Sequence, residues 1–189
     1  MVSVQINNQT VQIPKGATIL DAAKKAGIRI PTLCHLEGIE PKGACRVCLV
    51  EVENAKTLMA SCSTPAAEGM KIHTNTKRVR DARRTVVELL LSEHDGDCKT
   101  CDRNDDCELQ ALAREMGIDT IRYEGEKTAK RIDQSTPALV RDSGKCIKCR
   151  RCVDACVGIQ TVGSIFPQGR RFDSETGPAF FMTLDRVAC

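Results

Sequence analysis

Apolar and polar residues alternate in two short stretches at the start of the chain, over residues 2–6 and 9–13. A period of two places successive side chains on opposite faces of a strand, so each stretch predicts a β-strand. Asn7 and Asn8 lie between the two stretches and are typical of a tight turn. The two strands are therefore expected to pair as a hairpin.

A short helix and further strands are predicted after this hairpin. Thr18 and Asp21 have the spacing of a capping box, which predicts the start of a helix that ends at Gly27. Two more strands are expected over residues 47–52 and 70–73. A hairpin, a helix and added strands predict a small α+β domain.

From residue 76 onwards, the spacing of apolar residues changes to the period of a helix. Apolar residues recur three or four positions apart from Val79 to Leu90, which predicts an amphipathic helix that ends near Ser92. A polar loop covers residues 94–106, and residues 108–116 repeat the helical pattern before a glycine. These elements predict a second small unit of two helices.

Periodicity is weaker in the rest of the chain. Residues 119–137 are polar and are expected to form a connector, and residues 138–142 are expected to be extended. Glycine and proline recur after residue 158, which indicates irregular structure, with one more strand expected over residues 179–184. The domains expected from these changes of pattern are residues 1–75, 76–118 and 138–189.

The composition combines twelve cysteines with few aromatic residues, which make up 3% of the 189 residues. Small domains with modest hydrophobic cores usually need bound metals or disulfides to stabilise the fold. The N-terminus lacks the basic and apolar segments of a secretory signal, and no apolar run is long enough to cross a membrane. A cytoplasmic protein without membrane insertion is expected, whose patterned cysteines are metal ligands rather than disulfides.

The formal net charge of +3 is close to balanced, with one basic concentration over residues 77–84. Basic runs can mark contact with nucleic acid, but the aromatic side chains on which single strands stack are nearly absent. No nucleic-acid partner is expected. The basic side of this predicted helix is interpreted as facing solvent or another subunit.

The first group of cysteines suits a two-iron cluster. Its spacers are ten, two and thirteen residues, and the small residues Gly43 and Ala44 stand where backbone amides must approach cluster sulfide. A plant-type [2Fe–2S] site has this order, although its first spacer is shorter. Zinc is the alternative because C-x2-C suits either metal, but the surrounding strands and helix favour the cluster. The candidate ligands are Cys34, Cys45, Cys48 and Cys62.

The second group adds an imidazole to three thiolates on one predicted loop, in the order H-x3-C-x2-C-x5-C. Such a set can hold one [4Fe–4S] cluster or one zinc ion. A histidine in place of a thiolate makes the site less negative and is expected to raise the reduction potential. The other histidines, His35 and His73, are interpreted as surface or packed residues. The candidate ligands are His94, Cys98, Cys101 and Cys107.

The third group has the spacing C-x2-C-x2-C-x3-C, which is the most specific signal in the chain. In two-cluster ferredoxins the fourth cysteine of such a run binds the other cluster. Cys156 is therefore expected to bind a different [4Fe–4S] cluster from the three cysteines before it. Cys189 is either the missing ligand of the first cluster or the first cysteine of a second run. The complete group is Cys146, Cys149, Cys152, Cys156 and Cys189.

Taken in order, the three groups resemble an electron-input module of [FeFe]-hydrogenases, of the large iron–sulfur subunit of respiratory complex I, and of diaphorase subunits of NAD-linked hydrogenases and formate dehydrogenases. The resemblance covers essentially the whole chain and includes residues 61–65, 68–70 and 146–152. It implies an N-terminal β-grasp plant-type ferredoxin domain, a small two-helix His/Cys cluster domain, and a partial bacterial-type 2[4Fe–4S] ferredoxin domain.

Members of this family differ at the third group. The large complex I subunit matches only through Cys152, whereas hydrogenases and diaphorase subunits keep a cysteine at the position of Cys156. Residues 160–189 most resemble the NAD(P)-linked, multisubunit [FeFe]-hydrogenases, including electron-bifurcating ones. By this likeness Cys189 and Cys156 are the first and last ligands of a fourth cluster, and the catalytic H-cluster domain lies beyond the end of this chain.

The likeness implies an electron relay within a hetero-oligomeric oxidoreductase. No phosphate-binding glycine motif and no hydrogen-activating residue is recognisable, so the chain is expected only to carry electrons. They would pass between flavin- and NAD(P)-binding subunits or ferredoxin and the H-cluster. One [2Fe–2S] cluster, one [4Fe–4S] cluster with a histidine ligand and up to two further [4Fe–4S] clusters are expected. The alternatives are a diaphorase subunit and a zinc-stabilised binding protein.

Overall fold

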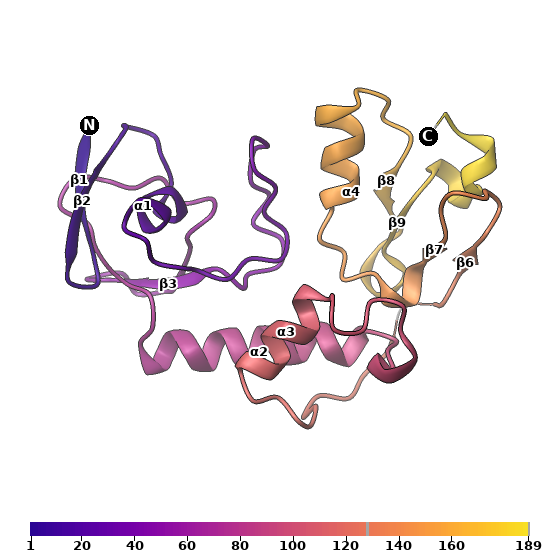
Figure 1. Ribbon diagram of the computed structural model, residues 1–189, viewed down its shortest axis with the longest axis horizontal. Helices are drawn as coiled ribbons and strands as arrows, with labels where there is room; N and C mark the ends of the chain where they lie inside the picture. Colours follow the sequence, from indigo (N-terminus) through magenta and orange to yellow (C-terminus); the bar gives the residue numbers. More distant parts are fainter. Residues whose placement is uncertain (128, 189) are drawn as a thin grey trace.

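A long helix, α2 (Lys77–Glu93), runs from the N-terminal sheet towards the C-terminal part of the molecule (Figure 1). The structure is a computed structural model that describes residues 1–127 and 129–188. Helices and strands are mixed along the chain, as the predicted α+β class requires. No helix within the described residues is long and apolar enough to cross a membrane.

The N-terminal part is built on a five-stranded sheet with the strand order β2-β1-β5-β3-β4. The predicted hairpin is confirmed, because the first two strands pair antiparallel from Val2 opposite Ile13 to Ile6 opposite Gln9. The first and fifth strands pair in parallel, and the other pairs are antiparallel. The strands are β1 (Val2–Ile6), β2 (Gln9–Ile13), β3 (Leu49–Val52), β4 (Met59–Ala60) and β5 (Lys71–His73).

Helix α1 (Ile19–Lys25) covers this sheet and begins at the predicted capping box. The Thr18 hydroxyl accepts a hydrogen bond from the Asp21 N–H, and the Asp21 carboxylate accepts one from the Thr18 N–H. These bonds satisfy two backbone donors that the first helical turn leaves open. The apolar side of the helix packs into the sheet core with Val4, Ile6, Val50 and Ile72.

A second core joins α2 to α3 (Glu108–Glu115) and to the N-terminal part. Both helices were expected from their apolar periodicity and are confirmed within a few residues. Gly117 follows α3 with φ of +62°, the left-handed conformation that commonly ends a helix. This core contains Leu33 and Val47 from the N-terminal part with Val87, Leu109 and Leu112.

The C-terminal part has two small antiparallel sheets and one short helix. The strand expected over residues 179–184 is wrong. Residues Ala179–Phe181 form a 3-10 turn instead, because Phe180 and Phe181 adopt positive φ values of 55° and 56° that a strand cannot contain. Of the stretch expected to be extended, only Arg141 and Asp142 lie in a strand. The elements are β6 (Ile132–Asp133), β7 (Arg141–Asp142), α4 (Arg151–Asp154) with a π-helical turn (Ala155–Ile159), β8 (Phe166–Gln168) and β9 (Glu175–Gly177).

Candidate iron–sulfur centres

The four cysteines of the first group come together in the interior of the N-terminal part, where none is more than 7% exposed. The Sγ atoms of Cys48 and Cys62 are 3.4 Å apart. The N–H of Cys45 donates a hydrogen bond to the Sγ of Cys34, with N and S 3.4 Å apart. Four buried thiols gathered together are the donor set that a [2Fe–2S] cluster requires. The residues present therefore fit the cluster.

Hydrogen bonds among these thiols drive their pKa values apart. Thiol hydrogen bonds from Cys45 and Cys62 lower the pKa of Cys34 to about 2, and one from Cys62 lowers the pKa of Cys48 to about 6. The pKa of Cys45 and of Cys62 is raised, first because each donates to Cys34. Cys34 and Cys48 therefore favour the thiolate, which is the form that binds iron.

The loop that carries Cys45 and Cys48 is tightly folded against the segment that carries Cys62. Gly43 has φ of +61°, and a Cβ on it would lie 3.2 Å from the Ser63 hydroxyl oxygen. The N–H of Ser61 donates to the Cys48 carbonyl at 3.1 Å. A small residue at Gly43 thus lets the two ligand-bearing segments approach each other.

His94 of the second group stands at the C-terminal end of α2. Its Nδ1 is buried and has no hydrogen-bond partner in the described structure. Burial is the first cause that lowers the pKa of His94, so the imidazole is neutral at pH 7, as a metal ligand must be. An unpartnered, neutral and buried ring nitrogen fits a ligand role.

The cysteines of the second group lie along the loop that follows. Cys98 opens a 3-10 turn and lines a hollow of about 480 Å³ together with His94. Cys101 and Cys107 are half-buried and are not among the residues that line this hollow. The structure thus brings His94 and Cys98 to one site, and Cys101 and Cys107 do not line it.

Single-ion sites are absent from residues 1–127 and 129–188, since no three His, Cys, Asp or Glu side chains meet closely enough to hold one metal ion.

The segment that carries the first cysteines of the third group contains two residues in the left-handed conformation. Lys148 and Arg150 have positive φ values of 55° and 65°, and the Lys148 N–H points at the Sγ of Cys146, 3.4 Å away. Burial raises the pKa of Cys146 and Cys152, so metal binding at neutral pH must displace their protons. Cys149 is half-buried between them.

Cys156 stands apart, in the π-helical turn after α4. Its Sγ accepts a hydrogen bond from the Ser164 N–H at 3.1 Å. Burial acts to raise its pKa, but the amides of Ser164, Ile165 and Gly163 outweigh this and lower it. Amides directed at a sulfur are a feature of cluster ligands. Cys189, its expected companion, lies outside the described residues.

Candidate ligands from all three groups touch one apolar cluster. Cys34 and Cys45 of the first group belong to the second core, and Cys107 of the second group packs against it. Cys149 of the third group packs against the same core. The structure therefore brings the three groups together around a shared interior.

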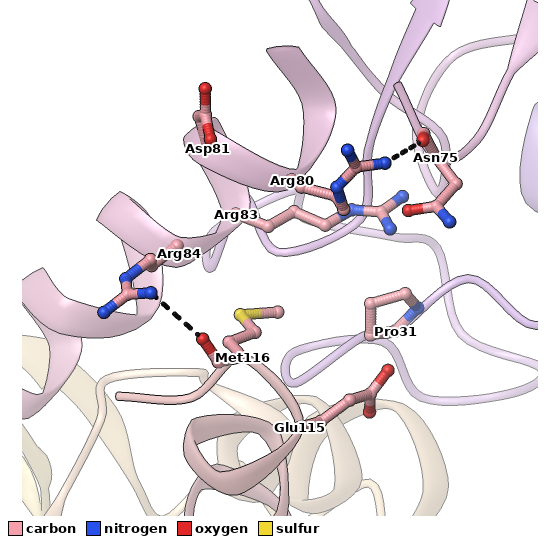
Figure 2. Close-up of a pocket in the computed structure, with 8 residues that line it drawn as sticks. All are labelled: Pro31, Asn75, Arg80, Asp81, Arg83, Arg84, Glu115 and Met116. Atoms are coloured by element: carbon pink, nitrogen blue, oxygen red, sulfur yellow. Dashed lines mark hydrogen bonds between the residues drawn. The ribbon is translucent and has the colours of Figure 1, made fainter. Parts of the chain in front are cut away.

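The sequence analysis missed one buried cation near the first group. The basic side of α2 was interpreted as facing solvent or a subunit, which is wrong for Arg83, because that residue is 7% exposed. Figure 2 shows Arg80 and Arg83 on one wall of a pocket of about 320 Å³, with Pro31 and Met116 on the other. The helical spacing of the sequence indicates this burial. Arg83 lies four residues from Val79 and from Val87, so the three residues share one side of the helix, and all three are buried.

Two families match the chain. Residues 1–77 match a 2Fe-2S iron-sulfur cluster binding domain, and residues 83–122 match the NADH-ubiquinone oxidoreductase-G iron-sulfur binding region. One solved structure, of an NAD+-reducing [NiFe]-hydrogenase in the H2-reduced state, has a chain that superposes with a TM-score of 0.88 at 31% identity. The match covers 94% of this chain and 75% of that one.

Curated relatives agree with these matches. The chain is 44% identical to the NADP-reducing hydrogenase subunit HndD of Solidesulfovibrio fructosivorans, over 100% of this chain and 33% of the relative. It is 39% identical to the NADH-ubiquinone oxidoreductase 75 kDa subunit of Reclinomonas americana, over 93% of this chain and 25% of the relative. It thus spans a third or less of these relatives. The chain belongs to the family of iron–sulfur electron-transfer modules that NAD(P)-linked hydrogenases share with the large subunit of NADH-ubiquinone oxidoreductases.

Proposed function

We propose that this chain is the electron-relay region of a cytoplasmic, NAD(P)-linked [FeFe]-hydrogenase. It passes electrons between flavin- and NAD(P)-binding subunits, or ferredoxin, and an H-cluster carried beyond residue 189. The 44% identity to a subunit of an NADP-reducing hydrogenase supports this assignment. The assembly is a hetero-oligomer in which this region has no catalytic residue of its own.

The observation that carries the proposal is the shared apolar cluster. Cys34 and Cys45 lie within it, and Cys107 and Cys149 pack against it. Three redox centres around one packed interior allow electrons to move between them without crossing solvent. The same interior shields Cys34 and Cys45 from water, which limits loss of metal and reaction with oxidants at the first site.

We assign the ligands as the sequence groups them. When bound, the clusters supply one-electron carriers, and the chain supplies thiolates, one neutral imidazole and amide donors. The [2Fe–2S] ligands are Cys34, Cys45, Cys48 and Cys62. The ligands of the first [4Fe–4S] cluster are His94, Cys98, Cys101 and Cys107. Cys146, Cys149 and Cys152 serve a second [4Fe–4S] cluster, and Cys156 and Cys189 serve another.

Metal analysis and EPR test the proposal on the purified chain after anaerobic reconstitution. The two complete sites should hold two and four irons with matching acid-labile sulfide, and reduction should give separate signals for a [2Fe–2S] and a [4Fe–4S] cluster. A colourless protein with stoichiometric zinc would refute the proposal.

A diaphorase subunit is the second candidate. It is favoured by the likeness to a chain of an NAD+-reducing [NiFe]-hydrogenase, of which this chain covers 75%. A diaphorase would bind the same clusters but would have no hydrogen-activating domain. Sequencing the gene past the codon for Cys189 separates the two: one further cysteine run in a short reading frame indicates a diaphorase, and a much longer frame indicates the hydrogenase.

A further inference from the structure

We infer that Arg83 is the buried counter-charge of the [2Fe–2S] site and acts as a positioning residue that raises the reduction potential of that cluster. The inference rests on the proposed assignment of Cys34, Cys45, Cys48 and Cys62 as its ligands.

The first step is the burial of an unpaired cation. Arg83 is 7% exposed, yet within the described structure no carboxylate forms an ion pair with it. Its two hydrogen bonds, from Nε at 3.1 Å and from Nη2 at 2.6 Å, both go to the carbonyl oxygen of Leu49. A buried charge is costly unless an opposite charge compensates it.

Glu88 on the same helix is a buried charge that does have ion-pair partners, so it serves as a comparison for Arg83. The Glu88 side chain is 0% exposed, and it is bound by Arg84 at 3.1 Å and by Arg122 at 2.8 Å. Among the residues that the structure describes, no carboxylate forms an ion pair of this kind with Arg83. Glu115, across the pocket in Figure 2, is bound to Arg29 instead. Glu115 attracts Arg83 less than the Cys48 sulfur does, so the larger attraction comes from the ligand side of the site.

The second step is the position of Arg83. The carbonyl that it binds belongs to Leu49, which directly follows Cys48. Burial lowers the pKa of Arg83, and attraction by the Cys48 sulfur is the first effect that opposes this. A [2Fe–2S] cluster held by four thiolates carries net negative charge, so it supplies the partner that Arg83 lacks.

The consequence for electron transfer follows from the sign of the charge. Reduction adds one electron to a centre that is already negative. A nearby cation in an environment of low dielectric constant stabilises the reduced form more than the oxidised form. By binding the Leu49 carbonyl, Arg83 also fixes the strand that follows Cys48. Its effect should therefore be specific to the first cluster.

Two variants of Arg83 and one control test the inference on the reconstituted chain. Arg83→Met removes the charge and keeps an apolar stem, and Arg83→Lys keeps the charge. Arg80→Gln is the control, because Arg80 lines the same pocket on the same helix but is exposed. Midpoint potentials of both complete clusters are measured by EPR-monitored titration, so the His94 cluster is an internal reference.

We expect Arg83→Met to weaken reduction of the [2Fe–2S] cluster roughly tenfold, a fall of about 59 mV for a one-electron couple. Arg83→Lys and Arg80→Gln should stay near the wild-type value, and the His94 cluster should not move in any variant. An unchanged potential in Arg83→Met, or an equal shift of both clusters, would overturn the inference. If Arg83→Met does not fold, a large fall in Arg83→Lys would overturn it, because lysine keeps the charge. Absence of a [2Fe–2S] signal in the wild type would instead refute the proposed function.

Discussion

Arg151 binds the carboxylate of Glu108 with two hydrogen bonds, from Nη1 at 2.5 Å and from Nη2 at 3.3 Å. Glu108 directly follows Cys107, and Arg151 directly precedes Cys152. The pair therefore connects α3 to α4 beside ligands of the second and third groups. Its strength contributes to how firmly those two groups are held relative to each other, together with the core that Cys107 and Cys149 share.

A double-mutant cycle measures that strength. The side chains of Arg151 and Glu108 are 31% and 60% exposed, so solvent screens the pair and its coupling energy should be roughly 0.2–1 kcal/mol in urea unfolding. Glu108→Gln and Arg151→Gln supply the single variants. The coupling should fall as salt is added.

The Lys77–Asp81 pair is the matched control for this cycle. It is more exposed, at 84% and 61%, and joins two residues of one helix. Its coupling energy should be smaller than that of Arg151 with Glu108. A larger value for the control would show that the bidentate geometry adds nothing.

Protonation of Glu88 should lower the free energy of unfolding in acid. Hydrogen bonds from Arg122, and then from Arg84, lower the pKa of Glu88 below its ordinary value of 4.5. A lowered folded-state pKa gives stability that is present above the unfolded-state pKa and is lost as pH falls towards the folded-state value. The free energy of unfolding of the wild type should therefore decline below about pH 4.5.

Glu88→Gln should remove that part of the acid dependence and lower stability at pH 7, because it leaves two cations without their anion. Glu40→Gln is the control, since Glu40 is exposed and forms no ion pair within the described residues. Urea titrations at pH 7 and pH 4 measure both effects. Equal slopes of stability against pH in the wild type and Glu88→Gln would contradict the prediction.

Local patterns were sufficient to predict the N-terminal hairpin and the first three helices. Alternation over residues 2–13 predicted the hairpin, and the Thr18–Asp21 spacing predicted the start of α1. Each signal depends on residues close in sequence, whose backbone preferences and caps act locally. The ligand groups were recognisable for the same reason, since each lies mostly on one loop.

Contacts between distant segments could not be predicted in the same way. The burial of Arg83 depends on a carbonyl 34 residues away in the sequence, so its basic neighbours alone favoured an exposed helix side. The strand expected over residues 179–184 is wrong because the positive φ values of Phe180 and Phe181 are incompatible with extended structure. Phe180 is in fact 89% exposed on a tight turn.

Replacing His94 by cysteine should lower the potential of the second cluster without removing it. A thiolate adds negative charge where the neutral imidazole adds none, so it favours the oxidised cluster. EPR-monitored titration of His94→Cys measures the shift, with the [2Fe–2S] signal as the internal reference. A potential that stayed constant or rose would contradict the assignment of His94 as a ligand.

Gly96 should control the position of the His94 ring. A Cβ on Gly96 would lie 2.8 Å from Cδ2 and 3.1 Å from Nε2 of His94, so Gly96→Ala must displace the imidazole. Gly125→Ala is the matched control, because a Cβ there meets nothing within 4 Å. We expect Gly96→Ala to change the EPR spectrum of the second cluster or reduce its iron content, with the [2Fe–2S] signal unchanged. Identical spectra for the two alanine variants would show that ring position does not govern the cluster.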